Sequence, residues 1–451
     1  MQYLPPDLVH AATEAGTHHP LITNDAVIFG ILMVILAVIF RTSQSQHPFF
    51  RKFYKWVPML LMCYFIPSLL TLFGIVDAEE SVLYYVASRY LLPASLVLLT
   101  ISIDLGAIIR LGPKALIMFF TGTVGVVLGG PLAILIVSAF DPSLVGGQGP
   151  DAVWRGLTTV AGSWIGGGAN QVAMKEIFMS GENENNTLFS VMVTIDVLVA
   201  EVWMLFLLLG VGQAKAIDRA FKADASNIEA LQQKMEKFSR ESARIPTTTD
   251  LMILGAVAFG ITGLCHLAAD LICPVMQGVH DNALEFAEQT GGRNSYEWIV
   301  NLSLNKEFFW IVVLATTLSI LLSFTRARNL EGAGASKLGT VFIFILVAVI
   351  GMRMDVTAIW TYKGLFLVGL IWMIFHVGLM FLVAWLIRAP YFFLAVGSKA
   401  NIGGAASAPV VAAAFHPALA PVGVLLAVLG YALGTYAAYV CGLLMQAAAP
   451  G

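Results

Sequence analysis

The sequence predicts an all-α protein that crosses a membrane many times and is built from two inverted repeats. An apolar composition, twelve long apolar segments and a paired glycine-rich motif lead to this prediction. Of the 451 residues, 58% are hydrophobic and 12% are charged, whereas soluble domains have about 45–50% and about 25%. So few charges cannot cover a water-facing surface, so lipid is the expected solvent for most of the chain. The net charge of −3 gives no indication of nucleic-acid binding.

A helix of about 20 apolar residues crosses a hydrocarbon core of roughly 30 Å. Segments that meet this requirement lie at 22–40, 56–76, 82–103, 115–140, 153–179, 187–212, 251–275, 307–325, 338–352, 364–387, 390–415 and 418–446. The first 21 residues lack a basic stretch followed by a short apolar core, so they do not resemble a cleavable signal peptide. We expect residues 1–21 to be periplasmic and the first segment to direct insertion.

A polar insert at residues 213–249 separates the sixth and seventh segments. Its apolar residues Ile228, Leu231, Met235 and Phe238 recur at helical spacing, which predicts an amphipathic linker helix on the cytoplasmic membrane surface. Binding of a protein partner is the alternative role for this insert.

The insert divides the chain into halves, residues 22–212 and 250–451, that resemble each other. Asp104 ends the third segment and Asp355 ends the ninth, and each is followed by basic residues. The fifth segment then carries GSWIGGGAN and the eleventh carries GSKANIGG. Two matching features in the same order indicate an internal duplication.

The distribution of loop cations bears on the topology. Full crossing by all twelve segments would violate the excess of Lys and Arg expected in cytoplasmic loops. The rule is satisfied if the fifth and eleventh segments enter and leave the membrane by the same face. The two halves then have opposite orientations, with ten crossing helices and two broken or re-entrant segments.

Consecutive glycines mark breaks in the fifth and eleventh segments, because each costs a helix about 1 kcal/mol relative to alanine. A broken helix inside a membrane is tolerated where protein or a watery cavity satisfies its backbone. The helix ends at such breaks can hold an ion or a carboxylate. Close helix packing is the alternative role of these small residues. The predicted substrate-binding residues are Ser163, Gly166, Gly167, Gly168, Asn170, Gln171, Ser398, Lys399, Asn401, Gly403, Gly404 and Ser407.

Charged residues inside apolar segments are functional candidates by default, because charge in lipid is costly. Lys399 lies in the second break and is expected to attract a substrate carboxylate or to pair with Asp196 in the empty state. Asp196 and Glu201, in the sixth segment, are the predicted ion-coupling residues. A structural ion pair is the alternative.

Other polar residues receive structural interpretations. His266 and His376 are expected to be packed and hydrogen-bonded, and Arg89 to pair with an acid or a helix end. Asp104 and Asp355 are expected to cap or anchor segment ends near the interface. The four cysteines are expected to be buried and reduced, and no metal site beyond possible Na⁺ is predicted.

The two glycine motifs, GSWIGGGAN and GSKANIGGAASAP, resemble those of the YjcL-like family of bacterial and plastid membrane proteins. The resemblance covers nearly the whole chain apart from residues 213–249 and 276–306. It implies membership of a clan of cation:proton antiporters and anion symporters, with a core domain that moves against a scaffold by an elevator mechanism. It also places Asp196 where sodium/proton antiporters have an ion-binding acid, although their second carboxylate is absent here.

The sequence therefore predicts a Na⁺- or H⁺-coupled secondary transporter of a small organic anion, amino acid or short peptide. A monovalent cation/proton antiporter and a non-transporting membrane sensor or assembly protein are the alternatives. No catalytic motif indicates an enzyme, and no cofactor besides possible Na⁺ is expected. We expect a homodimer in the bacterial inner membrane, in contact with lipid and a small solute but not with nucleic acid.

Overall fold

The computed structural model describes residues 20–450 apart from 58, 79, 102, 104, 110, 225–227, 229–244, 290–303, 355–361 and 417–418. The chain forms two compact units, residues 1–87 with 344–356 and residues 88–343 with 357–451. Most of the predicted periplasmic terminus and of the predicted amphipathic linker lies outside the described residues. So do Asp104 and Asp355 with their predicted anchoring roles.

Helices dominate the described part of the chain, where one isolated β-bridge joins Ile22 to Val76. Eight helical stretches are long and apolar enough to cross a membrane, by length and composition. They are α2 (Asp25–Ser43), α5 to α6 (Leu83–Ile101), α8 (Pro113–Ser138), α10 (Asn186–Val211), α13 (Thr248–Gln289), α16 (Ala335–Met352), α18 (Leu365–Leu386) and α21 (Ala420–Ala448).

Two shorter apolar helices account for two more of the predicted segments. The 14-residue α4 (Met59–Leu72) is one, and the 17-residue α15 (Glu307–Ser323) is the other. A bend of 98° joins α15 to the 3₁₀ helix η5 (Arg326–Ala333). The remaining two predicted segments are the glycine-rich ones, which the structure breaks. The chain is thus an all-α, multi-pass membrane protein, as the sequence predicts.

The smaller unit contains α2, α3 (Pro48–Trp56), α4 and the last turns of α16. Asn24 caps α2 by accepting a hydrogen bond from the backbone N–H of Ala26 at 2.9 Å. Gly351 in α16 lies so close to the backbone of Tyr64 that a side chain there would overlap it. Close backbone approach through small residues is the usual basis of helix packing in lipid.

The helix α13 extends further than the sequence predicted. A segment at 251–275 was expected, followed by a loop, but the helix continues through Pro274 to Gln289. The extension is helical because residues 276–289 contain good helix formers such as Met276 and Ala283. At 42 residues, α13 is about 63 Å long, roughly twice the hydrocarbon core.

The glycine-rich helix α9 (Val153–Phe178) is a hairpin whose two ends lie together. Arg155 Nη1 donates a hydrogen bond to the carbonyl oxygen of Phe178 at 3.0 Å, and the rings of Trp154 and Phe178 are 5.7 Å apart. A straight helix of 26 residues would separate its ends by about 39 Å. The chain reverses at Gly167, whose φ of 72° and ψ of −173° are open essentially to glycine alone.

The second glycine-rich segment forms an equivalent hairpin from α19 (Tyr391–Asn401) and α20 (Gly404–Phe415). Its base is closed by the ring of Phe415, which lies 5.2 Å from Phe392 and 6.0 Å from Tyr391. Its tip is Gly403, with a φ of 101°. Both segments therefore return to the face from which they enter, as the positions of the loop cations favoured.

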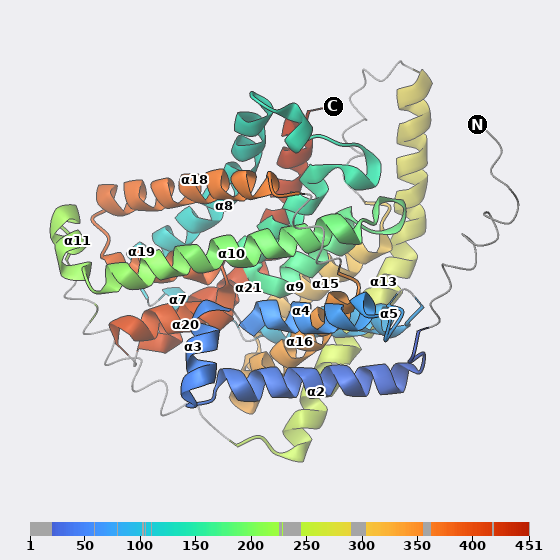
Figure 1. Ribbon diagram of the computed structural model, residues 1–451, viewed down its shortest axis with the longest axis horizontal. Coiled ribbons are helices and arrows are strands. Elements are labelled where there is room, and N and C mark those ends of the chain that lie inside the picture. Colours follow the sequence, from blue (N-terminus) through green and yellow to red (C-terminus); the bar gives the residue numbers. More distant parts are fainter. Residues whose placement is uncertain are drawn as a thin grey trace, which may run out of the picture. The chain divides into compact units, whose positions relative to one another are not determined.

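The two hairpins enter from opposite ends of α10 (Figure 1). Near the start of α10, Met192 packs against Gly156 at the base of α9. At the other end, Gly210 contacts the hydroxyl of Tyr391 at the base of α19. The 26 residues of α10 span about 39 Å, enough to cross a bilayer. The hairpins thus have opposite orientations, which is the geometry of an inverted repeat.

Candidate functional site

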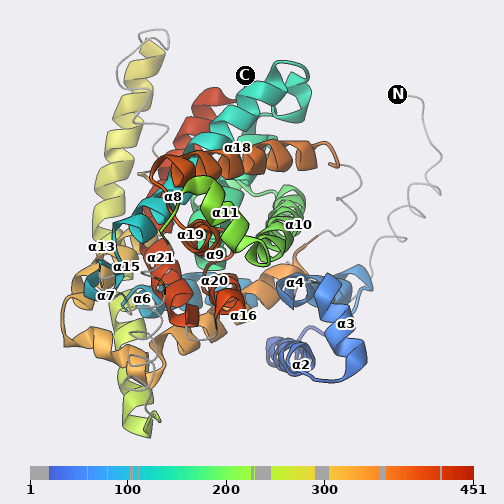
Figure 2. The same cartoon turned by 90° about the vertical axis from the view of Figure 1, so that its left-hand side faces the viewer.

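The tips of the two hairpins meet inside the larger unit. A Cβ atom on Gly404 would lie 3.9 Å from the Cα of Gly167, and the ring of Tyr431 contacts both glycines. A Cβ on Gly430 of α21 would lie 2.8 Å from the carbonyl oxygen of Ile165 and 3.2 Å from that of Ala400. The helix α21 therefore touches both inbound arms just before they reverse. Figure 2 shows α9, α19, α20 and α21 gathered in one region of this unit.

Asn170 fixes the tip of the first hairpin to α21. Its Nδ2 donates to the carbonyl oxygens of Gly166 at 3.0 Å and Tyr431 at 3.2 Å, and its Oδ1 accepts from Thr435 Oγ1 at 2.7 Å. Asn170 is fully buried. In this conformation, both amide N–H groups are used for structure.

Asn401 repeats this pattern at the second hairpin. Its Nδ2 donates to the carbonyl oxygens of Gly397 at 3.0 Å and Phe119 at 2.9 Å, and Thr123 Oγ1 donates to its Oδ1 at 2.8 Å. Each asparagine thus bonds a carbonyl four residues earlier, a carbonyl on a neighbouring helix, and a threonine four residues further along that helix. These two asparagines, predicted to bind substrate, are the structural anchors of the tips, and contact with substrate stays a prediction.

Asp196 lies where α10 passes the first hairpin, near the middle of that helix. Its Oδ1 accepts from Trp164 Nε1 at 2.7 Å and its Oδ2 from Gln171 Nε2 at 3.0 Å. Ser163 contributes a third hydrogen bond to the carboxyl group. Asp196 is 4% exposed. The donors come from both arms of the hairpin, so any change in its position changes the surroundings of this carboxylate.

Lys399 lies on the second hairpin and reaches α10 one helical turn beyond Asp196. Its ammonium group is fully buried and donates to the carbonyl oxygen of Ala200 at 3.0 Å. It also interacts electrostatically with the carboxylates of Glu201 and Asp196. The structure therefore brings Lys399 to the part of α10 that carries Asp196 and Glu201, the other two charged residues that the sequence singled out.

The hydroxyl group of Ser407 lies at the tip of the second hairpin, on the same side of Gly403 as the ammonium group of Lys399. Its Oγ has no hydrogen-bond partner within the described part of the chain, although the residue is only 8% exposed. A Cβ on Gly403 would overlap Ser407 Oγ and would lie 3.4 Å from Lys399 Nζ. An ammonium and a free hydroxyl beside a hairpin tip can receive a carboxylate or another polar group.

Ser398, another predicted ligand, has structural partners. Trp203 Nε1 donates to its Oγ at 2.9 Å, and His376 Nε2 lies 2.8 Å from the same atom. His376 is therefore packed and hydrogen-bonded, which confirms its structural interpretation.

Trp164 is the site residue that sequence reasoning missed. It follows Gly162-Ser163 as Lys399 follows Gly397-Ser398, and this alignment is the signal that would have found it. Its ring packs 4.9 Å from that of Trp372, whose indole donates to the carbonyl oxygen of Val126. The aligned positions thus place an indole on Asp196 from one hairpin and an ammonium on the carbonyl oxygen of Ala200 from the other.

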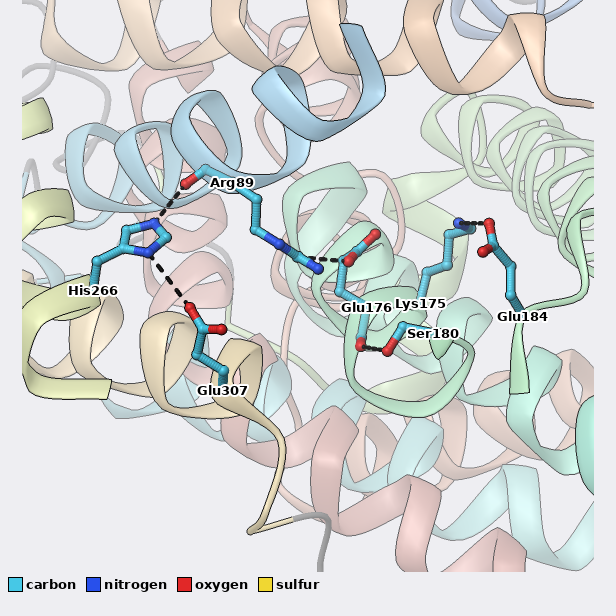
Figure 3. Close-up of polar contacts among 7 residues, drawn as sticks. All are labelled: Arg89, Lys175, Glu176, Ser180, Glu184, His266 and Glu307. Atoms are coloured by element: carbon cyan, nitrogen blue, oxygen red, sulfur yellow. Dashed lines mark hydrogen bonds and ion pairs between the residues drawn. The ribbon is translucent and has the colours of Figure 1, made fainter. Parts of the chain in front are cut away.

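A separate ion-pair network lies at the base of the first hairpin (Figure 3). Arg89, in the π-helical turn η1 (Ala87–Leu91), pairs with Glu176 of α9 at 2.7 Å, and Glu176 is buried. The Nε2 atom of His266 lies 2.9 Å from the carbonyl oxygen of Arg89, and its Nδ1 lies 3.7 Å from Glu307. These contacts confirm that Arg89 pairs with an acid and that His266 is hydrogen-bonded.

The fold and the site together define a multi-pass membrane protein with two re-entrant hairpins whose tips meet around buried charge. The chain belongs to the family described as "Protein of unknown function (DUF819)", whose model matches residues 30–448. It is similar to the "Uncharacterized membrane protein YjcL" of Bacillus subtilis (strain 168), at 24% identity over 429 residues. That match covers 93% of this chain and 96% of the Bacillus protein. The family resemblance of the glycine motifs is confirmed, and its wider link to transporters stays a prediction.

Proposed function

We propose that the protein is a secondary transporter that couples a Na⁺ or H⁺ gradient to movement of a small solute, with an organic anion preferred. The observation that carries the proposal is the convergence of Lys399 Nζ and the unpartnered Ser407 Oγ at a hairpin tip. A buried ammonium beside broken helix ends is suited to an anionic group. Burial makes such a charge costly, so a functional use is the natural reason for it.

Asp196 is the proposed coupling residue. Its carboxylate shares α10 with Ala200 and Glu201, the residues that contact or attract Lys399. Binding of Na⁺ or a proton at Asp196 would change the electrostatic field at Lys399, and solute binding at Lys399 would change the affinity of Asp196. Such mutual effects between two sites are reciprocal. Oxygen atoms of Asp196 and Ser163 are the groups that would hold Na⁺.

Movement of the hairpin core against the rest of the protein would supply alternating access, and the inverted orientation of the hairpins suits this mechanism. We place the protein in the bacterial inner membrane as a homodimer. The proposal assigns it no enzymatic reaction and no cofactor besides possible Na⁺.

The first experiment is a thermal-stability screen of the purified protein against a metabolite panel, in Na⁺ and in choline. A ligand at a hundredfold excess over its Kd stabilises the bound state by about 2.7 kcal/mol. An organic anion whose stabilising effect requires Na⁺ would identify both substrate and coupling ion. Stabilisation by the anion in choline, strengthened at low pH, would indicate proton coupling.

Uptake into proteoliposomes then tests the two roles. Lys399→Ala should weaken uptake of the anionic solute more than that of a neutral analogue, whereas Lys363→Ala, an exposed-lysine control, should change neither. Asp196→Asn should abolish dependence on the ion gradient. Equal loss for charged and neutral solutes, or unchanged ion dependence, would contradict the assignments.

A cation/proton antiporter is the second candidate. The electrostatic interaction of Lys399 with both Asp196 and Glu201 favours it, because a proton or cation could exchange against the lysine charge. This function predicts stabilisation by Na⁺ or K⁺ alone and pH-dependent cation exchange in vesicles without an organic solute.

A further inference from the structure

A second binding surface lies on the outside of the larger unit, away from the hairpin tips. It is a groove of about 780 Å³ between α10 and α18, closed at one end by α11 (Ala214–Phe221) and Tyr391. Its walls are apolar and include Val202, Phe206, Leu370 and Ile374, all of them between 49% and 63% exposed. Such a groove offers nothing to a polar solute and suits a hydrocarbon chain.

The α11 end of the groove is positively charged. Lys215 and Arg219 are exposed on α11, and the exposed Lys222 follows it directly. Arg388, also exposed, precedes α19. Figure 1 shows α11 at the shared end of α10 and α18.

The acidic residue within α11 does not cancel this charge at the surface. The carboxylate of Asp218 accepts a hydrogen bond from the backbone N–H of Tyr391 at 2.7 Å, so it faces the protein rather than solvent. The exposed Asp224, beyond Lys222, already has an interaction of its own. Among the residues that the structure describes there, cations therefore predominate where the apolar groove ends.

We propose that this groove binds an anionic phospholipid, with an acyl chain along α10 and α18 and the head group at Lys215, Arg219 and Lys222. Basic residues beside apolar helix surfaces are the usual recognition elements for anionic lipid head groups. An apolar channel that ends in cations at the end of membrane-spanning helices complements a molecule with one long apolar part and one negative end.

The bound lipid would contact residues that hold the second hairpin. Trp203 and Tyr391 line the groove. The indole of Trp203 donates to Ser398 Oγ, and the hydroxyl of Tyr391 donates to the carbonyl oxygen of Leu207 at 3.0 Å. Lipid in the groove would therefore stabilise α19 next to Lys399. This inference stands whether or not the protein is a transporter.

The test uses the purified, delipidated full-length protein in detergent, titrated with phosphatidylglycerol or with phosphatidylcholine of identical chains. Phosphatidylglycerol should raise the melting temperature and remain bound in native mass spectra, and phosphatidylcholine should do so far more weakly. The triple variant Lys215→Gln/Arg219→Gln/Lys222→Gln should lose affinity for phosphatidylglycerol by on the order of a hundredfold. The control Arg41→Gln/Arg51→Gln/Lys52→Gln, which removes three exposed cations elsewhere, should not.

A second pair of variants tests the groove itself. Gly378 lines it, and a Cβ there would meet nothing within 4 Å, so Gly378→Leu should fold and displace the acyl chain. Gly263→Leu, at an equally open glycine of α13, should leave lipid binding intact. Glycerol phosphate, the head group without chains, should not stabilise the protein.

Equal effects of the two lipids, or retention of phosphatidylglycerol by the triple variant, would overturn the proposal. So would a change from dimer to monomer in Gly378→Leu with no change in bound lipid, because a second copy of the chain would then occupy the groove.

Discussion

Gly167 and Gly404, more than two hundred residues apart in the sequence, lie so near each other that a Cβ on Gly404 would be 3.9 Å from the Cα of Gly167. Each stands at the tip of a helical hairpin, and the hairpins enter from opposite ends of α10. Asp196 and Ala200, near the middle of that helix, contact one hairpin each. The buried side chains of Asp196 and Lys399 are thereby placed near the middle of α10.

The hairpin form of α9 predicts which loops share a side of the membrane. Ser143→Cys and Glu182→Cys, at exposed positions before and after α9, should react with an impermeant maleimide from the outside of intact cells. Lys222→Cys should react only after permeabilisation. Cys273→Ser removes the one native cysteine that is not buried. Labelling of positions 143 and 182 from opposite sides would show that α9 crosses the membrane.

The backbone at the first tip predicts a difference between neighbouring glycines. Gly167→Ala should lower stability by about 1–3 kcal/mol, because its φ of 72° and ψ of −173° are open essentially to glycine alone. Gly168→Ala should cost much less, since its φ is not positive and its Cβ would make an ordinary contact at 3.7 Å with Ile343. Melting curves in detergent measure both, and equal losses would contradict this account of the turn.

The asparagine anchors predict coupling between Asn401 and Thr123. Asn401→Ala and Thr123→Val each remove the same 2.8 Å hydrogen bond. The double variant should therefore be more stable than the sum of the single losses predicts, by about 0.5–1.5 kcal/mol. Thr262→Val combined with Asn401→Ala should be additive, because the Thr262 hydroxyl bonds within α13. Additivity of the first pair would mean that the amide does not depend on the threonine.

The ion pair in Figure 3 predicts an asymmetric response. Arg89→Ala should cost about 3–5 kcal/mol, because it deprives the buried Glu176 carboxylate of its 2.7 Å partner. Adding Glu176→Gln should restore much of that stability by removing the buried charge that has lost its arginine partner. Chemical or thermal unfolding measures the difference, and no recovery in the double variant would indicate that packing of the arginine on Phe308 matters more.

The structure locates the predicted charges more sharply than the sequence could. Lys399 was expected to pair with a substrate or with Asp196; it interacts electrostatically with both Asp196 and Glu201 and donates its hydrogen bond to the carbonyl oxygen of Ala200 between them. Asp196 and Glu201 are five residues apart, so their side chains leave α10 in different directions. Which of them Lys399 approaches therefore depends on where the second hairpin packs against this helix. Asn170 and Asn401 were similarly expected to face a ligand, and their threonine partners lie on helices distant in the sequence.

The sequence by itself determined the membrane class, the helical segments and the two glycine breaks. These depend on local composition, because apolar length decides whether a helix suits lipid and glycine decides where it breaks. The cation distribution further favoured a reversal of direction in the fifth and eleventh segments.

Only the tertiary structure decided that both segments are hairpins and that their tips meet. Phe178 packs on Trp154, and Phe415 packs on Phe392, so the two ends of each hairpin are held together. The glycines of α21 have no side chains, which lets the first arm of each hairpin pack closely against that helix. Those contacts join residues far apart along the chain, and no local pattern encodes them. The site exists because helix packing brings Lys399 of the second repeat to Ala200, one turn beyond Asp196 on α10 of the first repeat.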